Sequence, residues 1–114
     1  MRRGEIWTLR DDNYASKARP VVVVQSNTVN DFDSVILALL TTFVRPDPSF
    51  RVQVDPSEEN GLRQPSYVMV EKLATVRRQD LGMRIGSLTA AQMREISQKL
   101  AAVLAITSDD ITDA

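Results

Sequence analysis

The sequence predicts an α+β fold that is mainly antiparallel β, in which a small, partly closed barrel is covered by a C-terminal α-helix. Short β-branched or alternating runs recur over residues 4–76, polar or proline-containing segments separate them, and helical periodicity appears only near the end of the chain. The 114 residues show no shift in composition. We therefore expect one domain over residues 1–107 and a flexible, acidic tail over residues 108–114.

The first half of the chain predicts three strands. Residues 4–9 alternate in polarity, residues 21–24 are an uninterrupted run of valine, and residues 34–41 contain Val-Ile-Leu-Ala-Leu-Leu. The last two runs are apolar throughout, which is typical of strands buried on both faces. The polar residues 10–18 are expected to form an exposed loop, and residues 27–33 to connect the two buried strands.

The second half predicts two further strands between turns. Residues 43–49 contain two prolines and predict a loop, whereas residues 50–54 alternate, with Phe50 expected in the core. Another exposed turn is expected at residues 56–65. Alternation then resumes over residues 67–76 and is expected to continue to the end of that strand. One face should carry Val68, Val70, Lys72 and Ala74, and the other Tyr67, Met69, Glu71, Leu73 and Thr75.

The end of the chain contains the clearest helix signal. Thr89 and Gln92 match a capping box, and Leu88 and Met93 match the hydrophobic staple around it. Apolar residues then recur at helical spacing and are expected to pack on the sheet, namely Met93, Ile96, Leu100, Val103 and Leu104. After Ile106 the periodicity stops, so no regular structure is expected there.

Composition restricts the chemistry that the chain can perform. It contains no histidine and no cysteine, which removes the commonest general base, thiolate nucleophiles and the usual transition-metal ligands. Catalysis would have to use carboxylates, hydroxyls, lysine or arginine, with no metal and no cofactor. The net charge of −1 argues against a strongly basic nucleic-acid binder. Without a signal-peptide core or a long apolar segment, the protein is expected in the cytoplasm and not in a membrane.

Considered singly, each candidate catalytic residue has an ordinary structural explanation. Arg19 precedes a proline at a loop–strand junction, where arginines are usually solvated. Thr41 and Thr42 end an apolar strand, where β-branched residues are common. Glu71 lies within a strand and would ordinarily face solvent, and Arg77-Arg78 is typical of a charged turn.

In combination, these residues stand in a recognisable order. The chain reads Arg-Gly-Glu-Ile-Trp at residues 3–7, Arg-Pro-Val-Val-Val-Val-Gln-Ser-Asn at 19–27 and Leu-Leu-Thr-Thr at 39–42, followed by a strand at 66–71 and the closing helix. This order resembles the MazF/PemK (Kid) family of toxin–antitoxin ribonucleases from Arg3 to about Ile106. The resemblance implies a CcdB-like, SH3-like barrel and a homodimer whose subunits shape one RNA channel. It also implies metal-independent cleavage of single-stranded RNA, and a cognate antitoxin that blocks the channel with an acidic segment.

The resemblance further implies that Arg19 and Thr41 are catalytic residues, with Thr42 as a second hydroxyl. Physical reasoning agrees, because a guanidinium can stabilise the extra negative charge of a phosphorane and a hydroxyl can orient the attacking 2′-oxygen. Glu71 completes the set of catalytic candidates. The expected RNA-binding residues are Thr42, Tyr14, Lys17, Phe43 and Arg45.

The chain departs from the family pattern at two positions. Tyr14 stands where many members have a glutamate that is a proposed base, and Ala74 stands where members often have an arginine. The proton acceptor therefore stays open, with Glu71, Asp11, Asp12 and Tyr14 as candidates in that order of preference. An arginine is a poor base because its pKa exceeds about 12.

Two alternatives belong to other functional classes. A CcdB-like gyrase poison would share the fold, but such proteins end in a tail that contains tryptophan, and the single tryptophan here is Trp7. A non-catalytic barrel that only binds other proteins would cut no RNA. The sequence does not predict which bases are recognised, although the loops at 10–18 and 43–51 are the expected determinants. Tyr14, Phe43 and Phe50 are the candidate surfaces for base stacking, with Phe50 more readily assigned to the core.

Overall fold

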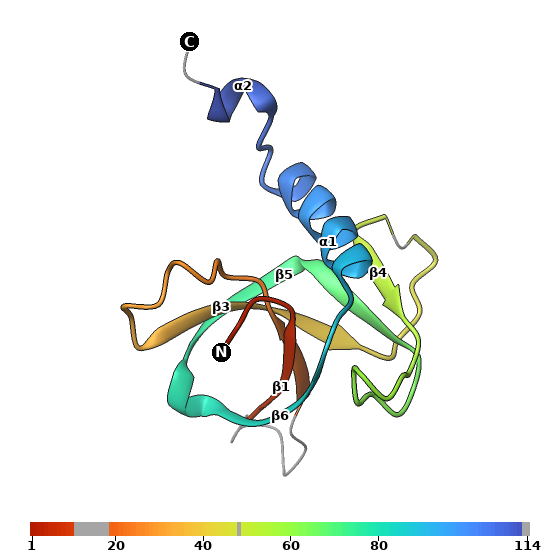
Figure 1. The fold of residues 1–114 in the computed structure, drawn as a ribbon. Coiled ribbons are helices and arrows are strands. Elements are labelled where there is room, and N and C mark those ends of the chain that lie inside the picture. Colours follow the sequence, from red (N-terminus) through yellow and green to blue (C-terminus); the bar gives the residue numbers. More distant parts are fainter. Residues whose placement is uncertain (11–18, 48, 113–114) are drawn as a thin grey trace.

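The computed structural model describes residues 1–10, 19–47 and 49–112, and these form one curled sheet with a helix across it (Figure 1). The sheet has six strands in the order β4-β5-β3-β2-β1-β6, and neighbouring strands are antiparallel. Its strands are β1 (Glu5–Leu9), β2 (Arg19–Val23), β3 (Ser34–Thr41), β4 (Arg51–Val54), β5 (Ser66–Arg77) and β6 (Leu81–Ser87). The helices are the 3-10 turn η1 (Arg78–Asp80), α1 (Ala90–Val103) and α2 (Ser108–Ile111). The predicted fold class is confirmed.

Apolar side chains gather on both faces of the sheet. One cluster lies under α1 and includes Val22 together with Ile96, the fully buried residue of the helix. The other lies on the opposite face and includes Val21 and Val23. Successive residues of a strand point to opposite faces, so a valine run serves both clusters. No helix in the described ranges is long and apolar enough to cross a membrane.

The start of α1 is as predicted, but its end differs. The amide of Gln92 donates to Thr89 Oγ1 at 3.1 Å and the amide of Thr89 donates to Gln92 Oε1 at 2.9 Å, which confirms the capping box. Leu104 was expected in the apolar stripe but is the C-cap residue and is 53% exposed. Beyond it, the expected irregular tail contains the single turn α2, whose N-cap Thr107 forms a second capping box with Asp110. Flexibility of this tail stays a prediction.

Strand β6 is absent from the sequence prediction. Glycines interrupt it, and only Leu81 of its residues is buried, so neither alternation nor an apolar run marks it. Gly86 is required by a close backbone approach, because a Cβ atom there would lie 2.4 Å from the carbonyl carbon of Asn60. The strand forms by pairing with β1, a long-range interaction that local sequence does not encode.

Strand β5 contains a large bulge that overturns the predicted alternation. Met69 pairs with Leu39 of β3, and Leu73 pairs with the adjacent Ala38, so residues 70–72 have no partner in β3. The faces are exchanged after the bulge. Leu73 packs with the cluster under α1, and Ala74 packs with the opposite cluster, the reverse of the expected arrangement.

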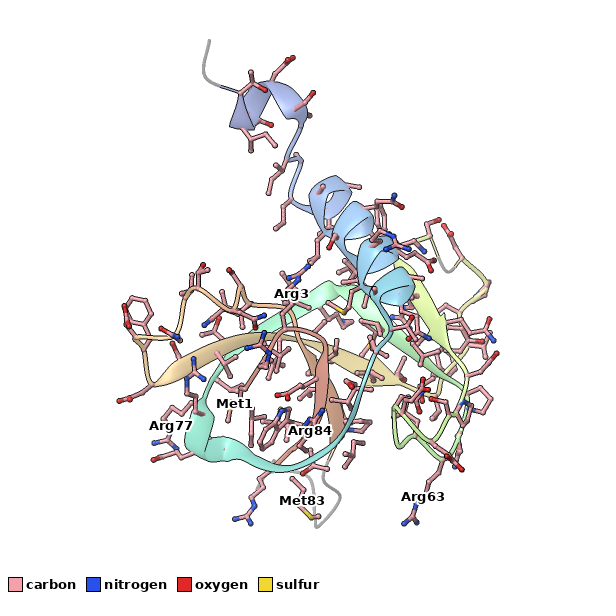
Figure 2. All side chains as sticks on the ribbon, in the orientation of Figure 1. Met1, Arg3, Arg63, Arg77, Met83 and Arg84 are labelled. Atoms are coloured by element: carbon pink, nitrogen blue, oxygen red, sulfur yellow. The ribbon has the colours of Figure 1, made fainter. Side chains whose placement is uncertain are left out.

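The Arg-Gly-Glu-Ile-Trp motif joins the sheet to the helix. The Arg3 guanidinium donates to the carbonyl of Val24 and to Ser97 Oγ of α1, the latter at 2.8 Å, and Figure 2 shows Arg3 beside α1. Gly4 has a φ of +94°, and a Cβ atom there would lie 3.3 Å from Met93 Cγ of the helix. The motif therefore has a structural role in seating α1.

Replacing Arg3 with alanine should lower the free energy of unfolding by about 1 to 2 kcal/mol, because its side-chain hydrogen bonds to the Val24 carbonyl and to Ser97 of α1 are lost. Urea denaturation followed by circular dichroism measures the change. The neighbouring exposed Arg2 is the matched control, and Arg2→Ala should leave the transition midpoint unchanged. Equal midpoints for the two variants would contradict the structural role.

Candidate active site

Four neighbouring strands bring the candidate residues to one face of the sheet. Cross-strand pairing aligns side chains in rows, one of which consists of Val21, Leu39, Met69 and Arg51. Extending the pairing of Val21 with Leu39 by two residues places Arg19 opposite Thr41. The beginning of β2 and the end of β3 therefore lie side by side at the same end of these two strands.

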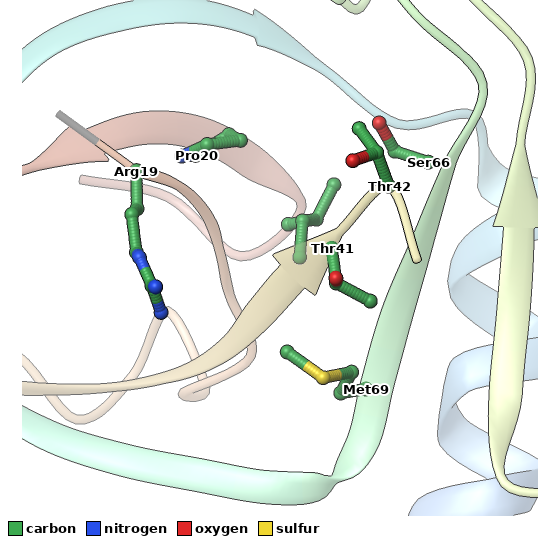
Figure 3. A pocket seen from close by; sticks show the side chains of 7 residues that line it. Arg19, Pro20, Thr41, Thr42, Ser66 and Met69 are labelled. Atoms are coloured by element: carbon green, nitrogen blue, oxygen red, sulfur yellow. The ribbon is translucent and has the colours of Figure 1, made fainter. Parts of the chain in front are cut away.

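Arg19, Thr41 and Thr42 line one hollow of about 260 Å³, which we call the Arg19 pocket (Figure 3). The arginine lies on one side and the two threonines on the other. Thr41 is half-buried, and its Oγ1 accepts a hydrogen bond from the amide of Phe43 at 3.1 Å, which fixes the side-chain rotamer. The remaining lining residues are Pro20, Leu40, Ser66 and Met69. The structure thus brings together three of the residues that the sequence analysis selected.

Glu71 does not line the Arg19 pocket. Its carboxylate accepts from Arg51 Nε at 3.2 Å and from Arg51 Nη2 at 3.4 Å. Both residues belong to a second hollow of about 230 Å³, which we call the Glu71 pocket; its other lining residues are Arg45, Asp47, Ser49 and Phe50. The preferred proton acceptor is therefore separated from the proposed catalytic pair.

Of the other residues predicted to bind RNA or accept a proton, some lie in or near these two pockets and others lie outside the described residues. Arg45 lines the Glu71 pocket, and Phe43 lies just after β3 with 67% of its surface exposed. Tyr14 and Lys17, predicted to bind RNA, lie outside the described residues, as do Asp11 and Asp12.

Phe50 and Arg51 have the opposite burial to that expected from the sequence. Phe50 was expected in the core but is 44% exposed, whereas Arg51 is 8% exposed. Burial of the guanidinium is compensated by Glu71, and Lys99 Nζ of α1 donates to the Arg51 carbonyl at 2.7 Å. Sequence reasoning missed this arginine because its partner carboxylate is 20 residues away.

Asp47 supplies a second carboxylate to the Glu71 pocket. Hydrogen bonds from the hydroxyl and the amide of Ser49 hold the pKa of Asp47 below its usual value, and the charge of Arg45 contributes less. Asp47 therefore remains ionised down to a lower pH than an ordinary aspartate. Among residues 1–10, 19–47 and 49–112, no three acidic side chains are grouped so that they could hold a metal ion.

The chain is similar to known toxins over nearly its whole length. Residues 2–104 match the family described as PemK-like, MazF-like toxin of type II toxin–antitoxin system. A probable endoribonuclease MazF from Mycolicibacterium smegmatis is 33% identical over 107 residues, which cover 93% of this chain and 98% of the relative.

Solved structures agree with the sequence match. The Mycobacterium tuberculosis toxin MazF-mt6 superposes with a TM-score of 0.76 at 32% identity, covering 90% of this chain and 98% of that one. An endoribonuclease from a mycobacterial species, solved with its cognate antitoxin, gives a TM-score of 0.77 at 27% identity, covering 94% and 97% of the two chains. The chain therefore belongs to the PemK-like, MazF-like toxins of type II toxin–antitoxin systems, the MazF endoribonuclease family.

Proposed function

We propose that this endoribonuclease cuts single-stranded RNA without a metal ion, by attack of a 2′-hydroxyl on the adjacent phosphorus. The new bond joins the 2′-oxygen to phosphorus, and the bond from phosphorus to the 5′-oxygen breaks. The 2′-hydroxyl loses its proton to a base, and the departing 5′-oxygen takes one up. The products are a 2′,3′-cyclic phosphate and a 5′-hydroxyl.

The observation that carries this proposal is the meeting of Arg19 and Thr41 in one pocket. Arg19 presents a planar fork of donors, which suits the equatorial oxygens of a phosphorane better than those of the ground-state phosphate. Thr41 is held by the amide of Phe43 and keeps its hydroxyl hydrogen available for a phosphate oxygen or the 2′-oxygen. Thr42, on the same pocket wall, supplies a second hydroxyl.

Glu71 is not part of the proposed chemistry. It lines a different pocket, and both of its oxygens accept hydrogen bonds from Arg51. The proton acceptor is left among Asp11, Asp12 and Tyr14, which the sequence places in the loop before Arg19.

The proposed assembly is a cytoplasmic homodimer that a cognate antitoxin inhibits. The family match concerns toxins of toxin–antitoxin systems, and one structural relative was solved with its cognate antitoxin. The hollow at Arg19 is small, about 260 Å³, so one subunit offers RNA little surface. A second subunit would extend that surface, and an antitoxin covering it would block access to Arg19.

Cleavage should proceed in excess EDTA and leave 2′,3′-cyclic phosphate and 5′-hydroxyl ends, because the proposed chemistry uses the RNA's own hydroxyl and the described residues include no group of three acidic side chains that could hold Mg²⁺. A long RNA incubated with the purified protein, followed by mapping and chemical analysis of its ends, measures this. RNA with 2′-O-methyl groups is the control and should stay intact. A strict requirement for Mg²⁺, or 5′-phosphate ends, would overturn the mechanism.

A further inference from the structure

The Glu71 pocket adjoins the Arg19 pocket on the same face of the sheet. Met69 lines the Arg19 pocket, and its cross-strand partner Arg51 lines the Glu71 pocket. Glu71 follows Met69 by only two residues on β5, at the bulge that begins after Met69. Neighbouring nucleotides of one RNA strand could therefore reach both pockets.

The carboxylate of Glu71 is held in place and still has acceptor capacity. The Arg51 side chain is only 6% exposed and donates once to each carboxylate oxygen, whereas the Glu71 side chain is 28% exposed. Each carboxylate oxygen has two acceptor sites, so one on each oxygen remains unused by Arg51. The buried guanidinium of Arg51 therefore fixes the Glu71 carboxylate and leaves acceptor sites on its oxygens for a ligand.

The rest of the pocket suits a flat ring that carries hydrogen-bond donors. Phe50 is 44% exposed and supplies an aromatic surface on which a base can stack. Asp47 adds a second ionised acceptor, and Arg45 lies close enough to influence the Asp47 carboxylate. The volume of about 230 Å³ lies below the roughly 300 Å³ at which drug-sized pockets begin, so one base is the suitable occupant.

We propose that the Glu71 pocket binds one nucleobase next to the scissile phosphate and selects adenine, cytosine or guanine over uracil. The proposal rests on the ribonuclease function proposed above. Adenine, cytosine and guanine carry an exocyclic amino group that can donate to a carboxylate. Uracil presents two carbonyl oxygens on either side of one N–H, and carboxylates repel such oxygens. Glu71 thus acts as a specificity-determining residue that Arg51 positions.

The test compares Glu71→Gln with the matched variant Glu58→Gln, which changes an exposed glutamate that lines neither pocket. Substrates are short RNAs that carry each of the four bases in turn on either side of the cleaved bond. We expect the wild type and Glu58→Gln to prefer amino-bearing bases at one position by on the order of tenfold in kcat/KM. Glu71→Gln should lose this preference, because its amide also donates to uracil, and should keep its preferences elsewhere.

Two outcomes would overturn the proposal. An unchanged preference in folded Glu71→Gln would show that the residue reads no base. A loss of kcat by 10² or more on every sequence, with an altered pH–rate profile, would instead identify Glu71 as the general base.

Binding experiments separate this proposal from the cleavage mechanism. The same sequences with 2′-O-methyl groups cannot be cut by 2′-hydroxyl attack, and fluorescence anisotropy gives their Kd whether or not the protein cleaves RNA. We expect the preference for amino-bearing bases to persist in Kd, and to persist in Arg19→Ala. Phe50→Leu, a change at an exposed position, should weaken binding on the order of tenfold without altering the preference. Equal Kd values for all four bases in the wild type would reject the subsite even if cleavage is confirmed.

Discussion

Arg19→Ala should lower the turnover rate of RNA cleavage by on the order of 10² to 10³, comparable with the loss of one oxyanion-hole donor. Arg19 is proposed to stabilise charge that develops only in the transition state, so the Kd for RNA should change much less. Arg19 is exposed at the beginning of β2, and its removal should leave the core intact. Single-turnover kinetics and anisotropy binding on the same RNA separate the two effects.

Graded substitutions test the chemistry of the site more closely. Arg19→Lys should rescue turnover only in part, because an ammonium does not reproduce the planar fork of donors. Thr41→Val keeps the shape of the side chain and removes its hydroxyl, so it should show a smaller loss of the same kind. If Arg19→Ala cuts as fast as the wild type while circular dichroism shows it folded, Arg19 is not the catalytic centre.

Glu71→Leu should lower the free energy of unfolding by about 2 to 3 kcal/mol, because the nearly buried Arg51 guanidinium would lose its carboxylate partner. The expected loss is smaller than for a fully buried pair because Glu71 is partly open to water. Chemical denaturation at neutral pH measures it. Glu71→Gln, which keeps an oxygen that accepts from Arg51, should cost clearly less, and this makes it the suitable variant for the specificity test.

A double variant separates an uncompensated charge from lost packing. Glu71→Leu combined with Arg51→Met should recover most of the stability lost in Glu71→Leu, because no charge then stays buried without a partner. If the double variant instead lost the sum of the stabilities lost in Glu71→Leu and Arg51→Met, packing of the glutamate side chain and not its charge would be the stabilising contribution. Both proteins should keep Arg19 and Thr41 in place, since neither belongs to the pair.

Local patterns predicted the elements whose structure is determined locally. The apolar run predicted β3 over residues 34–41, and the Thr89 capping box predicted the beginning of α1. Strand β6 was missed because it depends on pairing with β1 and on glycines that admit close backbone contacts. The reversal of faces in β5 was missed because a bulge is defined only when the partner strand is known.

The family resemblance selected Arg19 and Thr41, and simple strand register explains why they meet. Arg19 and Thr41 come together because β2 and β3 are adjacent, regular and antiparallel. The pairing of Arg51 with Glu71 needs both the bulge of β5 and the register of β4 against β5. Alternation predicts that β4 is a strand, but the local sequence shows neither its register nor the bulge. Phe50 was assigned to the core by alternation, although β4 begins only after it, at Arg51.

The bulge at residues 70–72 of β5 also bears on how the two pockets could change separately in evolution. Glu71 has no partner in β3, so a change of its side chain does not alter the pairing of Met69 with Leu39. The row of side chains beside Arg19 and Thr41 would keep its geometry while the residue at position 71 varied. A toxin built in this way could acquire a new RNA preference by single substitutions without loss of its cleavage chemistry.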